Sequence, residues 1–260
     1  MTATYTTQLA AGLGMLEETR AYLALWQDGM NGEDLYRTAL ASGRFPNISA
    51  RRLHDSITVG FAPRFLRDGG RAARLLHSMQ DSLTKKEFDQ LLYLYTCRAH
   101  AILTDFICEF YWEAYRAGKP SISNDESLEF VNAAVQAGKT TTNWSDTIIR
   151  RAASNLTGCC ANFGLLEDGV RRERKILSFR IEPTVAAILA YDLHFGGQAD
   201  NQVVHHKDWM LFGMEPVDVL DELKRLSLRG YFIVQAAAGV AHIGWQYKTE
   251  EELAHAIARG

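Results

Sequence analysis

The sequence predicts a mainly helical protein built from winged-helix-like units, in which a helix-turn-helix is followed by a short β-hairpin. Apolar residues recur at helical spacing, and glycines divide the chain into short segments. Two of the predicted helices are followed by strand-forming residues. With 260 residues the chain can hold two domains. The polar stretch from Lys119 to Asp125 predicts their boundary, with a helix-turn-helix-like domain at 1–120 and a winged-helix-like domain at 121–260.

Three short helices joined by tight turns are expected at the start of the chain, at residues 13–27, 33–41 and 50–62. Asn31 and Ser49 can cap the second and the third. The third is expected to stop before Pro63, because proline cannot continue a helix without loss. This helix carries Arg51 and Arg52. The arrangement fits a helix-turn-helix, and it fits any small helical bundle equally well.

Helices are also expected in the middle of the chain, at residues 84–94, 99–115 and 125–137. Thr84 and Glu87 have the spacing of a capping box, in which each residue accepts a backbone hydrogen bond from the other. Asp125 can cap the last of these helices.

Two groups of potential metal ligands occur, and we expect neither to bind a metal ion. The first is a stripe of carboxylates on one helix face, made by Asp105, Glu109 and Glu113. A metal cage there would need partners from other helices, so a solvated stripe is expected. The second group is His205, His206 and Asp208. Adjacent histidines point in different directions on most backbones, and the four cysteines are not at ligand spacing.

The stretch from Trp144 to Pro183 carries the functional prediction. Ser145 can cap a helix there, and Asp146 complements the helix dipole. The apolar residues that follow lie within a sector of about 140°. The opposite face carries Thr147, Arg150, Arg151, Ser154, Gly158 and Ala161. A helix in the major groove of DNA needs such a face, basic at one end and small at the other, although a surface helix with solvated arginines has it too.

A basic ribbon is expected directly after this helix. Gly164 can end the helix, and Glu167-Asp168-Gly169 supplies a turn. The ribbon then carries the basic residues Arg171, Arg172, Arg174 and Lys175. It continues as a strand through Ile176, Leu177, Phe179 and Ile181. This order is that of a recognition helix followed by a wing, while an isolated charge run is more often a solvated edge strand.

A similar unit is expected near the C-terminus, with a helix at 216–228 and hairpin strands at 231–235 and 240–247. Its helix is acidic, so it is expected to act as a scaffold or to meet a protein partner rather than DNA. A last short helix is expected at 250–258.

Charge is distributed unevenly along the chain, whose net charge is −3. Basic residues exceed acidic ones by five at 44–80 and by four at 139–180, and the rest is acidic. This pattern favours one local anionic partner. No phosphate loop, nucleophile elbow or zinc-protease motif is present, so we expect no catalytic activity and no cofactor. Neither a signal peptide nor a membrane span is indicated, which favours the cytoplasm.

Short motifs spread in order over almost the whole chain add a family resemblance. They are Tyr5-Thr6-Thr7, Leu16-Glu17-Glu18-Thr19, Leu25-Trp26, Arg64-Phe65-Leu66, Asp105-Phe106 with Tyr111-Trp112, Trp144-Ser145, Phe163-Gly164-Leu165-Leu166, and Trp209 with Leu211-Phe212-Gly213. Together they resemble the BrxA family of bacteriophage-exclusion (BREX) systems. The resemblance implies a cytoplasmic, winged-helix-like component with affinity for double-stranded DNA and no catalytic activity, encoded beside methyltransferase and ATPase partners.

We therefore expect a non-catalytic protein that binds double-stranded DNA in phage defence. The residues expected to contact DNA are Thr147, Arg150, Arg151, Ser154, Arg171, Arg172, Arg174 and Lys175, with Arg51 and Arg52 extending the footprint. If about six phosphates are neutralised, the logarithm of affinity should fall against that of salt with a slope near −5. Two alternatives stay open: an adaptor whose basic islands dock on other defence proteins, and an RNA-binding helical protein.

Overall fold

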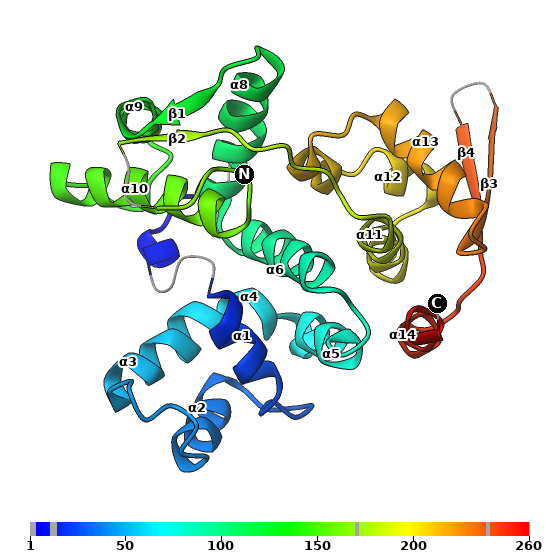
Figure 1. Ribbon diagram of the computed structural model, residues 1–260, viewed down its shortest axis with the longest axis horizontal. Coiled ribbons are helices and arrows are strands. Elements are labelled where there is room, and N and C mark those ends of the chain that lie inside the picture. The colour runs from blue at the N-terminus through cyan, green and yellow to red at the C-terminus, as the bar shows by residue number, and fades with distance from the viewer. Residues whose placement is uncertain (1–3, 11–14, 170–171, 238–239, 260) are drawn as a thin grey trace. The chain divides into compact units, whose positions relative to one another are not determined.

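The computed structural model describes residues 4–10, 15–169, 172–237 and 240–259 (Figure 1). Helices dominate, and the described strands form two antiparallel sheets of two strands each, so the prediction of a mainly helical protein is confirmed. The contacts divide the chain into unit 1, residues 1–77 and 92–179, and unit 2, residues 78–91 and 180–260. Unit 1 contains residues from both sides of position 120. The division into domains at 1–120 and 121–260 stays a prediction.

The first helices of the chain are α1 (Leu16–Leu23), α2 (Gly32–Ala41), α3 (Ala50–Asp55), α4 (Ala62–Phe65) and α5 (Arg71–Met79). The predicted caps are confirmed, because the side chains of Asn31 and Ser49 accept backbone N–H bonds from the first turns of α2 and α3. The expected start of the first helix at Leu13 lies outside the described residues.

The third helix does not stop before Pro63, contrary to the prediction. Residues Ser56–Phe61 form a π-helical turn, and α4 carries the helix through Pro63 to Phe65. In this turn the backbone N–H of Ala62 donates to the carbonyl of Ile57, five residues back. The wider turn leaves room for the proline ring, so Pro63 removes one backbone donor without ending the helix.

The middle helices are α6 (Lys85–Ala99), α7 (Ala101–Asp105) and α8 (Trp112–Arg116), with a second π-helical turn at Phe106–Tyr111. The capping box before α6 is confirmed, since Thr84 Oγ1 accepts from Glu87 N at 3.3 Å and Glu87 Oε2 accepts from Thr84 N at 2.8 Å. The buried Tyr111 hydroxyl donates to the carbonyls of Leu165 (3.2 Å) and Leu177 (3.3 Å). This helix therefore anchors both arms of the basic ribbon.

The remaining elements of unit 1 are β1 (Ser121–Ser123), α9 (Asn124–Gln136), α10 (Asp146–Asn162) and β2 (Glu173–Lys175). Ser123 caps α9, so the prediction that Asp125 does so is wrong. Ser123 Oγ accepts from Glu126 N at 3.1 Å, and Glu126 Oε2 accepts from Ser123 N at 2.9 Å. This reciprocal pair satisfies two backbone donors, which favours a start two residues earlier.

Unit 2 contains α11 (Pro183–Phe195), α12 (Asp200–Val204), α13 (Pro216–Ser227), β3 (Phe232–Ala237), β4 (Val240–Trp245) and α14 (Glu250–Arg259). The sequence did not predict α11. Its residues from Val185 to Leu193 are all buried, so it lacks the amphipathic pattern of a surface helix. The predicted hairpin is confirmed, with Phe232 opposite Trp245 in an antiparallel pair. Among the described residues, no helix has both the length and the apolar character needed to cross a bilayer.

Candidate nucleic-acid interface

Helix α10 begins after the polar residue Ser145 and is followed by Gly164, where the chain leaves the helical conformation. Ser145 occupies the N-cap position in an extended conformation, but its side chain makes no capping hydrogen bond. Gly164 ends the helix with a φ of 79°, which a residue with a side chain rarely adopts. The backbone N–H groups of Leu165 (2.9 Å) and Leu166 (3.3 Å) then both donate to the carbonyl of Cys160. The buried face of α10 packs against α9.

The outward face of α10 lies on its N-terminal half. Thr147, Arg150, Arg151 and Ser154 are all exposed. Within the described part of the chain, the guanidinium groups of Arg150 and Arg151 have neither an ion pair nor a hydrogen bond. These two adjacent arginines have no described acidic partner, so they give this half of the helix a positive surface on which an anion can bind.

The sequence predicted that the outward face continues to Gly158 and Ala161 in the C-terminal half of α10. In the structure it does not extend that far. Ala161 is only 6% exposed and Gly158 is half-buried, because residues 156–161 are enclosed on several sides. The Thr157 hydroxyl donates to Asn124 Oδ1 at 3.1 Å, which joins this half to the start of α9. Conversely Ile148, expected on the buried face, is 37% exposed. The candidate surface therefore ends near Ser154.

After α10 the backbone forms three antiparallel segments. On one side of the ribbon, β2 pairs with β1, with Ile122 opposite Arg174. On the other side, Leu166 forms a bridge with Ile176, and Glu167 N donates to Lys175 O at 2.9 Å. The central segment is thus flanked by 120–124 and 165–167. Figure 1 shows β2 running beside β1, with α9 and α10 in the same unit.

The ribbon's basic residues differ in how they are placed. Arg172 and Lys175 are exposed, and neither side chain has a described partner. Arg174 is half-buried, and its Nη1 donates to the carbonyl of Glu167 at 3.0 Å. The alternation along β2 therefore turns Arg174 to the opposite face of the strand from Lys175, and Arg172 directly precedes the strand. Arg171 lies outside the described residues.

The strand expected from Ile176 to Ile181 is not formed, and the observed strand β2 lies earlier, at Glu173–Lys175. Ile176 forms an isolated bridge with Leu166, and its backbone N–H donates to Pro120 O at 2.9 Å. Beyond it, the Phe179 ring packs edge-on against the Tyr93 ring at 5.4 Å, so this stretch is held by side-chain packing rather than by a sheet.

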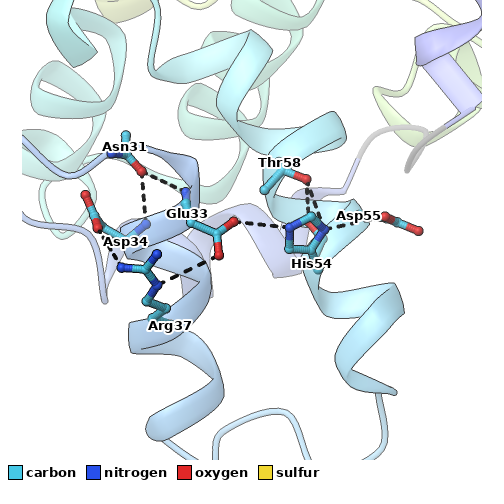
Figure 2. A network of polar contacts seen from close by, with 7 residues as sticks. All are labelled: Asn31, Glu33, Asp34, Arg37, His54, Asp55 and Thr58. Atoms are coloured by element: carbon cyan, nitrogen blue, oxygen red, sulfur yellow. Dashed lines mark hydrogen bonds and ion pairs between the residues drawn. The ribbon is translucent and has the colours of Figure 1, made fainter.

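Arg51 and Arg52 are exposed on α3, which packs against α2. His54, on the same helix, ties α3 to α2, because its Nε2 lies 3.2 Å from Glu33 Oε2. Figure 2 shows this network, in which Glu33 also meets Arg37 at 3.8 Å. The network fixes how α3 presents its two arginines. Their inclusion in one footprint with α10 stays a prediction.

The sequence did not predict a polar cluster that holds the segment before α10. The Tyr5 hydroxyl donates to Asp105 Oδ2 at 2.6 Å, and Lys139 Nζ lies 3.4 Å from the same oxygen and 3.7 Å from Glu109 Oε2. Tyr5 N also donates to Lys139 O at 2.7 Å. The expected solvated stripe is thus partly neutralised by Lys139. The helical spacing of the acidic residues was visible in the sequence. No local pattern around Lys139 indicated that its side chain pairs with Asp105 and Glu109.

The two adjacent histidines contact residues close to them in the sequence. His206 Nδ1 accepts from Asp208 N at 3.3 Å, and His205 Nδ1 lies 2.8 Å from Asn201 O. Across the part of the chain that the structure describes, no three His, Cys, Asp or Glu side chains are grouped so that they could hold a metal ion.

Comparison with known families now decides where the chain belongs. The family model BrxA matches residues 3–192, which is well over half of the chain. The chain belongs to the BrxA family. Membership makes this BrxA chain a component of a BREX phage-defence system and associates it with other BREX proteins.

A solved structure supports the fold. The BrxA chain is similar to an uncharacterized protein from Magnetospirillum magneticum, with a TM-score of 0.57 and 18% identity over 74% of this chain and 94% of that one. At this identity the likeness concerns the fold alone. No curated protein matches the chain.

Proposed function

We propose that the chain is a non-catalytic, cytoplasmic double-stranded DNA-binding component of a BREX system. In this proposal α10 enters the major groove, and the ribbon at 165–177 lies against the flanking phosphates. The observation that carries it is the pair Arg150 and Arg151, exposed and without described partners on the helix directly before the ribbon. Arginines on such a helix can reach base edges or phosphates.

The order of elements supports a winged-helix interpretation of residues 112–177. Helix α8, strand β1, helices α9 and α10, and then two paired arms follow one another, with the second arm also paired to β1. In winged-helix proteins this order makes the last helix the recognition helix and the loop between the arms the wing. Thr147, Arg150, Arg151 and Ser154 would then face the groove, while Arg172, Lys175 and Arg171 would contact phosphate.

Fluorescence anisotropy with a labelled DNA duplex at near-physiological salt tests the proposal. In the test variant, Arg150→Glu, Arg151→Glu and Arg172→Glu are combined. The control combines Arg225→Glu, Arg229→Glu and Lys248→Glu, which changes the net charge equally within acidic unit 2. We expect the test variant to bind more than about ten-fold more weakly than the wild type, because three phosphate contacts become repulsive. The control should bind as the wild type does.

Equal weakening in both variants would contradict the proposed face, since net charge alone would then explain binding. Duplex and single-stranded RNA in the same titration separate the RNA-binding alternative from the proposal. An adaptor would instead leave DNA unbound and lose its methyltransferase or ATPase partners when the same arginines are replaced.

A further inference from the structure

A hollow of about 290 Å³ lies in unit 1 between the N-terminal segment, α7 and α10. Leu9 and Ile102 line it and are only 4% and 2% exposed, so they form an apolar floor. Ile148 and Ala152 of α10 continue this apolar lining. Small-molecule sites usually occupy about 300–1,000 Å³, so this hollow has room for a compact ligand only.

The wall that the N-terminal segment contributes to the hollow is fixed by contacts just before it. Thr6 follows Tyr5, whose hydroxyl donates to Asp105 Oδ2 at 2.6 Å and whose backbone N–H donates to Lys139 O at 2.7 Å. The next residues, Thr7–Ala10, form a 3-10 turn that packs against α10. The hollow is therefore formed without a ligand, and a ligand that enters it does not have to order this wall.

Every polar side chain of the lining can donate a hydrogen bond, and none has a described partner. These side chains are Thr6, Thr7, Arg151 and Asn155. Of the described residues that line the hollow, none is acidic. Asp105, one helical turn after Ile102, is already engaged by Tyr5 and by Lys139 at 3.4 Å. The charge of Arg151 is thus available to a ligand in the hollow.

The lining indicates which chemical class of ligand fits. One arginine among uncharged donors matches a single negative charge, and a guanidinium binds a carboxylate through two parallel hydrogen bonds. A phosphate dianion would leave one of its charges unmatched, and a cation would be repelled by Arg151. The aliphatic floor matches an uncharged hydrocarbon body, which gains by leaving water.

We propose that this hollow binds a small organic carboxylate, with its carboxylate group on Arg151 and its aliphatic body over Leu9 and Ile102. The site goes beyond the proposed function, because it receives a small molecule on a different face of α10. Ile148, Arg151, Ala152 and Asn155 share that face at helical spacing, and the proposed DNA face next to it also includes Arg151.

The shared arginine couples the two faces. A carboxylate on Arg151 neutralises a cation that the DNA face uses, so the ligand should weaken DNA binding. This consequence rests on the proposed function, whereas the carboxylate site itself does not.

The test measures binding of three probes of equal chain length to the full chain by saturation-transfer NMR at neutral pH. The probes are hexanoate, 1-hexanol and hexylammonium. We expect hexanoate to bind at least about ten-fold more tightly than either of the others, because it alone satisfies both the arginine and the apolar floor. Acetate, which lacks the hydrocarbon body, should also bind at least about ten-fold more weakly than hexanoate.

Two variants and one control locate the site. Arg151→Gln should abolish the preference for hexanoate over hexanol. Ala152→Leu places a larger side chain in the hollow and should weaken binding of both about ten-fold. The control is Arg150→Gln, because Arg150 is the exposed neighbour of Arg151 and does not line the hollow. It should leave hexanoate binding unchanged while it weakens DNA binding.

Equal binding of hexanoate and hexanol, or absence of hexanoate binding, would overturn the proposal. Equal effects of Arg150→Gln and Arg151→Gln on hexanoate would also overturn it, since carboxylates would then gather on the positive face of α10 in general. The coupling is read separately by duplex anisotropy in hexanoate, with acetate at the same concentration as the salt control. If hexanoate shows the expected pattern but DNA binding is absent or unaffected, the carboxylate site stands and the coupling fails.

Discussion

Replacing Arg172 and Arg174 by glutamine, one at a time, should have different consequences, although the sequence makes these residues look alike. Arg172 is exposed and lacks a described partner, whereas the guanidinium of Arg174 is half-buried and donates to Glu167 O at 3.0 Å. Arg172→Gln should therefore affect DNA binding, and Arg174→Gln should affect stability.

The magnitudes follow from these environments. Each cation that neutralises one phosphate contributes about 0.9 to the slope of log affinity against log salt, so Arg172→Gln should make the slope shallower by about 0.9. A surface substitution of this kind changes the free energy of unfolding by less than about 0.5 kcal/mol. A hydrogen bond from a charged donor is worth about 1.5–3 kcal/mol, so Arg174→Gln in its half-buried site should cost about 1–2 kcal/mol.

Both quantities are measured on the same purified variants, the first by anisotropy with duplex DNA at several salt concentrations and the second by urea unfolding. The reasoning fails if Arg174→Gln makes the salt slope shallower by about 0.9 and leaves the unfolding free energy unchanged. That result would mean that the guanidinium of Arg174 contacts phosphate as Arg172 is proposed to do.

Three further predictions concern the core of unit 1. Tyr5→Phe removes the 2.6 Å hydrogen bond to Asp105 and should lower the unfolding free energy by about 1–2 kcal/mol in urea, with no loss expected for the exposed control Thr4→Val. Burial, with help from Arg64 and Arg67, lowers the pKa of His100 from 6.5 to about 3, so between these pH values the unfolded chain binds a proton that the folded chain does not. Stability should therefore fall by up to about 1.4 kcal/mol per pH unit as pH drops from 6.5 toward 3, and His100→Gln should flatten that part of the stability profile; an equally steep profile would contradict this. Burial also raises the pKa of the Cys159 thiol to about 12, so a thiol reagent should modify the partly exposed Cys108 first and reach all four cysteines only after unfolding.

The sequence could predict those elements whose signals are local. The capping box at Thr84 and the hairpin from Phe232 to Trp245 depend on nearby residues, and both are confirmed. The exposed half of α10 follows from helical periodicity, which correctly placed Arg150 and Arg151 outside.

The remaining features depend on contacts between distant residues. Helix α11 is buried all round, so it carries no periodic signal. The inward turn of Arg174 is set by which residue of β2 faces Ile122, and a shift of one residue would have reversed it. The burial of Ala161 likewise reflects how the C-terminal half of α10 is enclosed, and residue spacing along one helix does not encode this.

The anchoring of Tyr5 has a consequence for how the chain matures during translation. Its hydroxyl partner, Asp105, follows it by 100 residues. At about 5–20 residues per second, the ribosome needs roughly 5–20 s to deliver that carboxylate, and longer for Lys139. During this interval the Tyr5 hydroxyl lacks its native acceptor, so the segment around Tyr5 gains this contact only after the helix that carries Asp105 has been made.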